Sequence, residues 1–359
     1  AMALFARWRR DHVALDVALF AVLWLLAELA RTVIFTGFPW LYLGYAHLDT
    51  PIAGWAPVVG VFGLSFICAL TGSCLFLAWR SRKAIACTTY AVIVITMWGG
   101  GAVLKPIEWV AKGSEQPLSV VLYQPNVPQE HKWDRAWYRP ILEQLRSASE
   151  PHYGVDILVW PEAAIPNYYQ RARDFLDPIA ARAAAAETTL FVGAPSLSEQ
   201  GEGYFNSVVA IGDGEGIYHK HNLVPFGEYV PLERQLRGLI AFFDLPMSAF
   251  SPGPASQPPL RAGAYRVAPF VCYEVVYPEL VARSARDSDL LLTISNDSWF
   301  GTSIGPLQHL QMTQMRALEN GRYMIRGTNN GVSAIINHRG QIVARTDQFV
   351  EATLSGEVE

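Results

Sequence analysis

Three polar residues that could together catalyse a reaction each follow an apolar, strand-like run. Glu162 follows the run 158–161, Lys220 follows 217–219, and Cys272 closes 269–271. Taken singly, a carboxylate or an ammonium in such a place is more often a surface residue. Together, a thiol, a carboxylate and an ammonium supply a nucleophile, a general base and an oxyanion stabiliser. We therefore interpret the three as one candidate catalytic set.

Cys272 is the only cysteine in the polar half of the chain. The other three, Cys68, Cys74 and Cys87, lie in or beside apolar segments near the N-terminus. Cys272 therefore has no obvious disulfide partner in its own domain, which makes it a candidate nucleophile. The alternative is a buried thiol that packs as a small hydrophobic side chain.

The elements that must position this set are short apolar strands alternating with helices. The pattern predicts strands at 119–124, 156–160, 190–194, 207–211, 217–219, 265–272 and 289–295, and a hairpin formed by 332–337 and 341–346. It predicts helices at 133–149, 172–187, 278–286 and 306–326. Such alternation indicates sheets whose faces are covered, hence a layered α/β fold. Ligands of these folds bind beyond the carboxyl ends of strands.

The first hundred residues differ in composition and predict a membrane domain. Three apolar runs, 13–35, 53–79 and 84–103, are long enough to cross a bilayer, which takes about 20 residues. The first run carries Asp16, Glu28 and Arg31, so a buried helix of a soluble protein is its alternative. Glu28 and Arg31 are three residues apart and could pair on one helix face. We expect a membrane domain over 1–105 with about three transmembrane helices, and a globular domain over 106–359.

Positive charges predict the orientation of these spans. They precede the first run and fill the loop between the second and third, whereas the loop 36–51 has no Lys or Arg; the cations are Arg7, Arg9, Arg10, Arg80, Arg82 and Lys83. Three crossings then put the globular domain on the non-cytoplasmic side, which in a bacterium is the periplasm. No cleavable signal peptide is recognisable. Because disulfides form readily in such an oxidising compartment, an unpaired Cys272 there is a stronger indication of a functional thiol.

Composition and spacing argue against several other functions. The formal net charge of −4 disfavours nucleic acid as the main partner. His219 and His221 lack a third metal ligand, and neither a CxxC nor an HExxH spacing occurs. There is no phosphate-binding glycine loop. We therefore expect no metal and no cofactor.

Several multi-residue blocks resemble a known family. They occur in the order FTGFPW (35–40), WPEAAIP (160–166), KHNLVPFGEYVP (220–231), CYE (272–274) and TISNDSWFG (293–301). The Glu–Lys–Cys set resembles the nitrilase, or carbon–nitrogen hydrolase, superfamily, and the blocks resemble its apolipoprotein N-acyltransferase branch. The resemblance runs from about residue 28 to near the C-terminus. It implies a nitrilase-like αββα sandwich preceded by transmembrane helices.

The resemblance also implies a reaction. A fatty acyl chain moves from a membrane phospholipid, through a thioester on Cys272, to the N-terminal amine of a diacylated lipoprotein in the bacterial inner membrane. Glu162 would be the general base and Lys220 the oxyanion stabiliser, with the backbone N–H of Tyr273 as a second donor. The protein is expected to act as a monomer. Family members carry more spans than the three expected here, so the chain resembles a truncated form.

Other residues are candidates for supporting roles. Glu228 could orient Lys220, and Glu274 lies close to the nucleophile, although both could equally form structural ion pairs. Trp133 and Tyr273 could line the substrate pocket or pack in the core. The segment 232–247, which contains Phe242 and Phe243, is apolar enough for a membrane-facing lid over the site. Its alternative is a small separate core packed on the sheet.

Two other functions remain as alternatives. A membrane-tethered amidase of the nitrilase type would hydrolyse a small carbon–nitrogen substrate with the same three residues and would need a water-accessible pocket. A non-catalytic membrane scaffold would carry an unreactive Cys272. A transporter is disfavoured, because three spans are too few for the usual repeat architecture.

Overall fold

The structure is a computed structural model of the chain. It describes residues 1–9, 13–34, 37–81, 83–111, 113, 116–198, 203–225, 227–229 and 250–359. The chain divides into two compact units, Ala1–Ala111 and Lys112–Glu359. The segment 232–247, with the predicted pocket residues Phe242 and Phe243, lies outside the described residues, as do Arg10 and Arg82.

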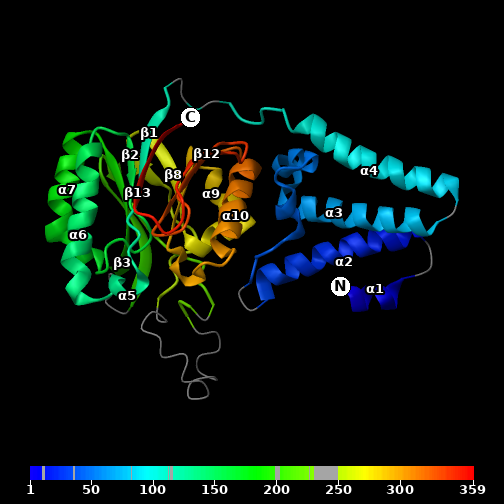
Figure 1. Cartoon of the computed structure of the whole chain (residues 1–359), viewed down its shortest axis with the longest axis horizontal. Helices are drawn as coiled ribbons and strands as arrows, with labels where there is room; N and C mark the ends of the chain where they lie inside the picture. The colour runs from blue at the N-terminus through cyan, green and yellow to red at the C-terminus, as the bar shows by residue number, and fades with distance from the viewer. Residues whose placement is uncertain are drawn as a thin grey trace, which may run out of the picture. The chain divides into compact units, whose positions relative to one another are not determined.

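The N-terminal unit is helical (Figure 1). Its helices are α1 (Met2–Trp8), α2 (Val13–Val33), η2 (Leu43–His47), η3 (Pro51–Trp55), α3 (Ala56–Arg80) and α4 (Ala84–Leu104). Two stretches are long and apolar enough to cross a membrane, Pro51–Arg80 and Ala84–Leu104. These coincide with the second and third predicted spans. The first predicted span forms α2 but is not one of the two, in keeping with its three charged residues.

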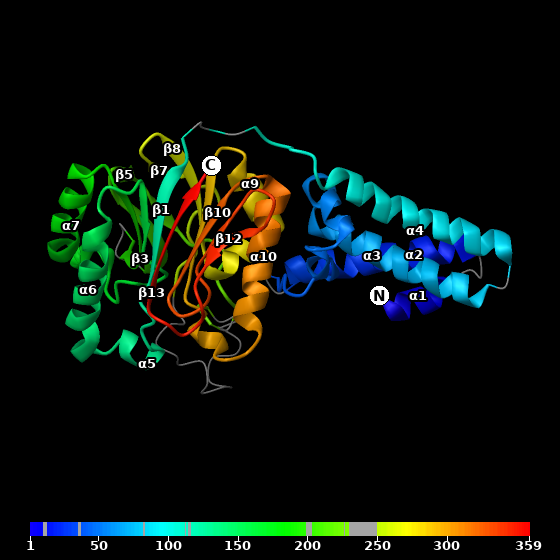
Figure 2. The same ribbon diagram turned by 45° about the horizontal axis from the view of Figure 1, so that its top comes forward.

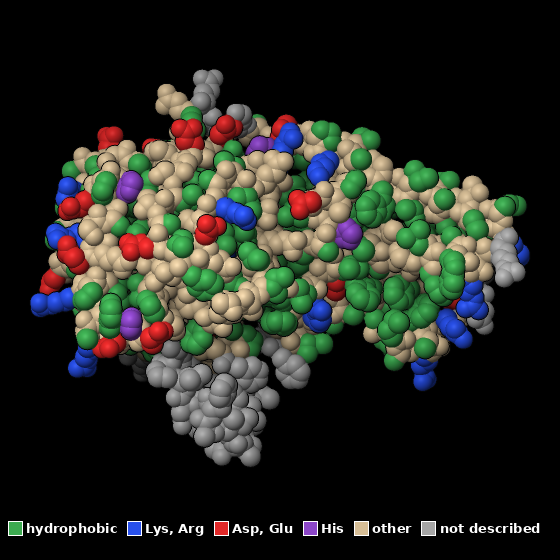
Figure 3. Space-filling model, viewed as in Figure 1, with side chains coloured by type: hydrophobic (Ala, Val, Ile, Leu, Met, Phe, Trp, Pro, Cys, Tyr) green, Lys and Arg blue, Asp and Glu red, His purple; other side chains and the backbone are tan. Residues whose placement is uncertain are grey.

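Hydrophobic side chains are exposed over much of this unit (Figure 3). Trp79, Ile85, Ile95 and Val103 are each more than 65% exposed. Apolar surface of this extent is rare on a soluble protein and is ordinary for helices that contact lipid. The pattern therefore favours a membrane environment for α3 and α4.

The predicted ion pair between Glu28 and Arg31 does not form. Glu28 Oε1 accepts hydrogen bonds from Trp24 Nε1 (3.1 Å) and from the backbone N–H of Leu43 (2.8 Å). Arg31 donates to the backbone oxygen of Trp40. Helical spacing permitted the pair, but both side chains instead satisfy the irregular segment that follows α2, whose backbone groups have no helical partners.

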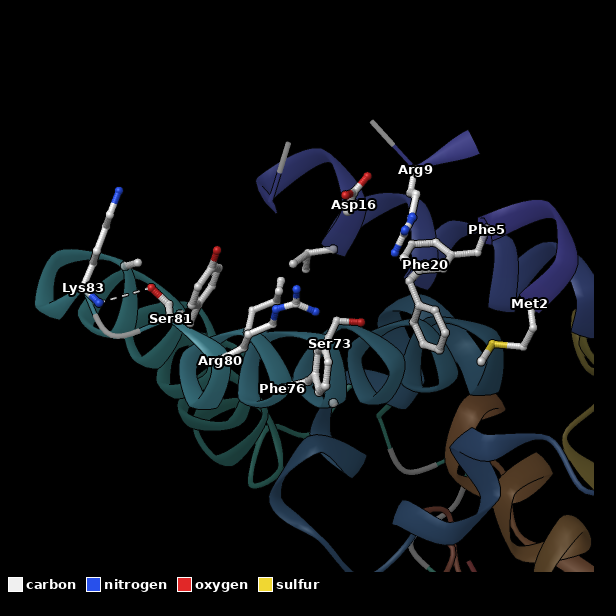
Figure 4. Close-up of a pocket in the computed structure, with 15 residues that line it drawn as sticks. Met2, Phe5, Arg9, Asp16, Phe20, Ser73, Phe76, Arg80, Ser81 and Lys83 are labelled. Atoms are coloured by element: carbon white, nitrogen blue, oxygen red, sulfur yellow. Dashed lines mark hydrogen bonds between the residues drawn. The ribbon is translucent and has the colours of Figure 1, made fainter. Parts of the chain in front are cut away.

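A cavity of about 1190 Å³ opens in the N-terminal unit (Figure 4). Phe5, Phe20 and Phe76 contribute to its apolar wall, and its charged residues are Arg9, Asp16, Arg80 and Lys83. No residue of the candidate catalytic set lines it. The chemistry predicted from the sequence belongs to the other unit.

The second unit contains two sheets. The first has strand order β13-β1-β2-β3-β4-β6 and the second β12-β11-β10-β9-β8-β7-β5. The strands are β1 (Leu118–Gln124), β2 (Ile157–Val159), β3 (Thr189–Leu197), β4 (Tyr204–Gly212), β5 (Gly214–Glu215), β6 (Ile217–His219), β7 (Leu260–Ala262), β8 (Tyr265–Val271), β9 (Leu290–Ser295), β10 (Met324–Thr328), β11 (Ala334–Ile336), β12 (Ile342–Arg345) and β13 (Ala352–Val358). The helices are α5 (Gln129–Lys132), α6 (Arg135–Ser149), η4 (Glu150–His152), η5 (Tyr169–Arg171), α7 (Arg173–Ala185), η7 (Cys272–Val276), α9 (Pro278–Ala285), η8 (Asp297–Phe300) and α10 (Gly305–Asn320).

The sheets pack face to face and helices cover their outer faces (Figures 1 and 2). Alternate side chains of β1 point into two different hydrophobic cores, because successive side chains of a strand point to opposite faces. Val120 and Leu122 belong to the core between the sheets, whereas Val121 and Tyr123 pack with residues of α6 and α7. Helices α9 and α10 cover the outer face of the second sheet. The four layers form the predicted αββα sandwich.

The predicted elements are found, with one clear error. The helix predicted over 306–326 ends at Asn320, and β10 begins at Met324. Gly321 has φ +58° and terminates α10 in the left-handed conformation. The apolar residues after Gly321 continued the apparent helical pattern, although they belong to a buried strand. β13, which pairs along the whole of β1, was not predicted.

Candidate active site

Glu162 follows β2 and has a carboxylate held from two sides. Asn206 Nδ2, on β4, donates to Oε1 at 2.7 Å. The backbone N–H of Asn296, just after β9, donates to Oε2 at 2.6 Å. Glu162 is 8% exposed. Because β4 and β9 belong to different sheets, the carboxylate is fixed where the two sheets meet.

Lys220 follows β6, the edge strand of the first sheet. Its ammonium is 2.8 Å from Glu228 Oε2 and 3.9 Å from Glu162 Oε1. Lys220 is only 1% exposed. Its backbone N–H donates to the oxygen of Asn206 at 2.8 Å. The interpretation of Lys220 as a surface lysine is therefore wrong, and a buried cation lies beside two carboxylates.

Cys272 begins a tight turn where β8 ends. The residue has φ +52°, which is uncommon and strained for a non-glycine residue. Val271 N–H donates to Glu274 Oε2 at 2.9 Å, and His309 Nε2 donates to the backbone oxygen of Cys272 at 3.1 Å. These bonds hold a turn that the backbone would not otherwise favour. The strand predicted over 265–272 thus ends one residue earlier, and the thiol stands on the turn.

The three groups perturb one another's protonation. Burial, reinforced by the nearby Glu162 carboxylate, raises the pKa of the Cys272 thiol, and the charge of Lys220 opposes this rise. Burial also raises the pKa of Glu162. Burial alone would lower the pKa of Lys220, but Glu228 and Glu162 outweigh it and raise that pKa. At neutral pH the site therefore holds a protonated thiol beside a permanent cation, so the thiol needs a base at the moment of attack.

Comparison with known proteins bears on the family of the chain. The family model described as carbon-nitrogen hydrolase matches residues 122–359, and the one described as apolipoprotein N-acyltransferase N-terminal domain matches residues 1–74. An apolipoprotein N-acyltransferase of Pseudomonas paraeruginosa is 50% identical over 355 residues, covering 98% of this chain and 69% of the relative. One from Pseudomonas aeruginosa is 49% identical over 355 residues, with the same coverages. The chain belongs to the apolipoprotein N-acyltransferase family.

A solved structure supports the fold. Nit3 of Saccharomyces cerevisiae, described as a member of branch 10 of the nitrilase superfamily, matches with a TM-score of 0.50 at 19% identity, covering 68% of this chain and 90% of Nit3. At that identity the match shows the nitrilase-like fold alone. The predicted family and fold are confirmed, and membership in the N-acyltransferase family favours that function over the amidase alternative.

Two of the predicted supporting carboxylates have clear contacts. Glu228 accepts from Lys220 Nζ at 2.9 Å and from Asn206 Nδ2 at 3.1 Å through Oε1. Its Oε2 accepts from the backbone N–H of Val224 at 2.9 Å. Glu228 is therefore placed to orient Lys220, which is the first of the two roles considered for it from the sequence.

Glu274 is fully buried, and both of its carboxylate oxygens accept hydrogen bonds from structural groups. Its Oε1 accepts from Tyr218 Oη (2.8 Å) and from the backbone N–H groups of His221 (2.7 Å) and Asn222 (3.1 Å). Its Oε2 accepts from Val271 N–H. The carboxylate thereby ties the segment after Lys220 to the turn that carries Cys272. The geometry gives Glu274 a positioning role and leaves it no evident part in proton transfer.

The predicted aromatic pocket residues are less constrained. Trp133 follows α5 and is 39% exposed. Tyr273 is buried and makes an edge-to-face contact with Tyr277, with ring centroids 5.4 Å apart. Core packing thus accounts for Tyr273 at least as well as substrate contact. Among the described residues, no group of three His, Cys, Asp or Glu side chains could hold a metal ion.

Sequence reasoning missed three residues of the site: Lys132, Asn206 and Asn296. Asn206 Nδ2 bridges Glu162 and Glu228. Lys132 is 3% exposed and donates from Nζ to the backbone oxygen of Glu162 at 2.9 Å. No spacing pattern marks these residues in the sequence. The only available signal was that Asn296 lies in the TISNDSWFG block directly after a buried strand.

A buried charged cluster supports the nucleophile turn from behind. Arg326 Nη2 donates to Asp297 Oδ2 at 2.6 Å, and Ser295 Oγ donates to Asp297 Oδ1 at 2.7 Å. His309 Nδ1 lies 3.1 Å from Asp297 Oδ1, while Nε2 contacts the backbone oxygen of Cys272. Breaking such a pair leaves a buried charge without a partner.

Asp297→Asn is therefore expected to destabilise the fold by about 3–5 kcal/mol, because Arg326 loses its buried counter-charge. Burial would raise the pKa of Asp297, but Arg326 and His309 hold it well below its usual range. A folded-state pKa below the unfolded value gives stability that is present above about pH 4 and is lost as the pH falls further. Thermal melts of the full chain from pH 3 to pH 7 should show a shallower acid decline for the variant. Equal melting temperatures at neutral pH would contradict this expectation.

Proposed function

We propose that this chain transfers a fatty acyl group from a membrane phospholipid to the N-terminal amine of a diacylated lipoprotein, through a thioester on Cys272. The observation that carries the proposal is the meeting of Glu162, Lys220 and Cys272 at the ends of β2, β6 and β8, in a member of the N-acyltransferase family. The nitrilase-like fold is shared with other enzymes, so the proposal rests on the site and the family together.

The first half-reaction acylates the enzyme. Glu162 takes the proton of the Cys272 thiol as the sulfur attacks the carbonyl carbon of the phospholipid ester. The ester C–O bond then breaks, and the alkoxide of the lysophospholipid leaves with the proton that Glu162 received. The products are a thioester on Cys272 and a free lysophospholipid, and Glu162 is again a carboxylate.

The second half-reaction transfers the acyl group. The lipoprotein's α-amine, in its neutral form, attacks the thioester carbonyl and loses a proton to Glu162. The C–S bond breaks and the thiolate of Cys272 recovers that proton. The products are an amide and the free thiol, so the enzyme returns to its starting state. A thioester suits this exchange because it remains reactive toward amines.

Lys220 would stabilise the oxyanion in both half-reactions. Its buried ammonium is held by Glu228, so it is oriented before substrate arrives and needs little reorganisation. The backbone N–H of Tyr273 is the proposed second donor, since it directly follows the nucleophile in the turn. Trp133, Phe242 and Phe243 are proposed to contact the acyl chain or head group.

The proposed location is the bacterial inner membrane, with several crossings and with the catalytic unit in the periplasm. Two apolar helices, Pro51–Arg80 and Ala84–Leu104, support membrane insertion. Arg80 and Lys83 flank the short connection between them, which favours a cytoplasmic position for that end. With α2 as a further crossing, the catalytic unit follows on the opposite side. We propose that the protein acts as a monomer.

The direct test is mass spectrometry of the intact chain and of its peptides after incubation with phospholipid vesicles. The proposal predicts a fatty-acyl mass on the Cys272 peptide that hydroxylamine removes and that a diacylated lipopeptide accepts on its amine. Cys87→Ala is the matched control, because it removes a partly exposed cysteine of α4 and should acylate normally. No adduct on Cys272, with the thiol still alkylated by a small reagent, would favour the amidase alternative. An unreactive thiol would favour the scaffold.

A further inference from the structure

A second buried lysine lies beside the three proposed catalytic residues. Lys132 ends the short helix α5 and is 3% exposed. Its ammonium donates to the backbone oxygen of Glu162 at 2.9 Å. Among the described residues it forms no ion pair, and its hydrogen bond goes to a carbonyl oxygen and not to a carboxylate. A buried ammonium that contacts no carboxylate directly is costly, and such groups in an active site are commonly functional.

The carbonyl of Glu162 that Lys132 contacts belongs to a turn whose backbone is also constrained by other contacts. Ala163, directly after Glu162, has φ +46°. On the side facing β3, a Cβ atom on Gly193 would lie 2.1 Å from the backbone oxygen of Pro161 and 2.9 Å from the Cα of Glu162. Gly193 thus permits a close approach of the two chains. The backbone at Glu162 therefore lies close against β3 at Gly193, and its carbonyl oxygen accepts from Lys132.

Helix α5 also reaches the carboxylate of Glu162 by a second route. Gln129, its first residue, accepts through Oε1 from Asn296 Nδ2 at 2.9 Å. The backbone N–H of the same Asn296 donates to Glu162 Oε2 at 2.6 Å. The two ends of this four-residue helix therefore act on the two ends of Glu162, its peptide carbonyl and its carboxylate.

The charge of Lys132 also interacts with the reacting groups. Burial lowers the pKa of Lys132 to about 8, and the negative charge of Glu162 opposes that fall. Lys132 in turn helps to keep Glu162 ionised. Other charged groups near the reacting atoms are Lys220, 3.9 Å from Glu162 Oε1, Glu228, which pairs with Lys220, and Asp297, which also raises the pKa of Cys272. Fold stability alone would favour an apolar side chain in this place.

We propose that Lys132 is a positioning residue for the proposed acylation of Cys272. Its ammonium holds the peptide carbonyl of Glu162, so that the carboxylate remains directed at the thiol and is kept ionised for proton transfer. The proposal rests on the acyl transfer described above, but its geometry concerns the base and the nucleophile of any reaction at this site.

The test compares Lys132→Met, Lys132→Arg and the control Lys105→Met in the full chain. Lys105→Met removes an exposed lysine that follows α4. In Lys132→Met we expect acylation of Cys272 from phospholipid vesicles to slow by about ten- to a hundredfold, as small misplacements of a catalytic group do. The vesicle concentration for half-maximal rate and the melting temperature should change little. Lys132→Arg should recover part of the rate.

A second measurement needs no lipid and separates this proposal from the proposed function. Alkylation of Cys272 by iodoacetamide, followed on its own peptide from pH 6 to pH 8, where Lys132 still carries its charge, reports the thiolate fraction of the thiol. Lys132→Met should shift that profile to higher pH, because a cation near Glu162 and Cys272 is lost, and Lys132→Arg should leave it near wild type. A shifted profile in an enzyme that forms no acyl adduct would support Lys132 and refute the acyl transfer.

Three results would overturn the proposal. One is acylation by Lys132→Met within twofold of wild type. Another is an alkylation profile that Lys132→Met leaves unchanged. The third is a large fall in the melting temperature of Lys132→Met with normal acylation at a lower temperature, which would assign Lys132 to the fold alone.

Discussion

Cys272→Ala is expected to abolish acyl transfer while the chain folds normally. Without the sulfur no thioester can form, so the rate should fall by at least about a thousandfold, as it does when a nucleophile is removed from a covalent mechanism. The turn should survive, because its bonds involve the backbone of Cys272, the N–H of Val271 and the side chains of Glu274 and His309. Transfer to a diacylated lipopeptide and the melting temperature together measure the effect.

The Cys87→Ala variant serves as the control for this experiment, since it also replaces a thiol by a methyl group but lies in the other unit. Its transfer rate should equal that of wild type. Transfer at a wild-type rate by Cys272→Ala would rule out the thioester mechanism. Equal losses in both variants would point to a general effect of removing cysteines.

Lys220→Met should slow acylation of Cys272 by about a hundred- to a thousandfold, which corresponds to the loss of one oxyanion donor, about 3–4 kcal/mol. The single variant also leaves the buried carboxylates of Glu162 and Glu228 without their cation. Loss of that partner would itself destabilise the fold. The rate must therefore be read together with the melting temperature.

The double variant Lys220→Met with Glu228→Gln separates the two effects. It removes the stranded charge of Glu228 while retaining a side chain of similar shape beside Asn206. We expect it to melt closer to wild type than the single variant and still to acylate poorly. Recovery of the rate in the double variant would remove Lys220 from oxyanion stabilisation, as would a rate for Lys220→Met within twofold of wild type.

Local patterns in the sequence predicted most of the catalytic unit. Short apolar runs such as 290–295 have every residue buried in the structure, and their alternation with helices indicated covered sheets. The predicted helix 306–326 ran past the observed end of α10 at Asn320, and this error has a local cause as well. Gly321 is the residue that ends a helix in the left-handed conformation, and it was outweighed by the apolar residues that follow.

The remaining features depend on contacts between distant parts of the chain. Lys132 contacts a residue 30 positions away, and Asn296 contacts Glu162 across 134 positions. Neither has a local pattern that identifies its partner. Glu162, Lys220 and Cys272 were recognisable because each follows a strand and carries a reactive side chain. Their neighbours have the same residue types as many surface positions, and only the fold distinguishes them.

The pairing of β1 with β13 has a consequence for how the protein is made. β1 is the first strand of the catalytic unit, yet its partner is the last, with Leu118 opposite Val358. Val358 also belongs to the core between the sheets. During synthesis one edge of β1 must therefore wait, unpaired, until the distant strand β13 has been translated. Completion of this sheet depends on β13, and a nascent chain interrupted before that strand would expose a strand edge prone to aggregation.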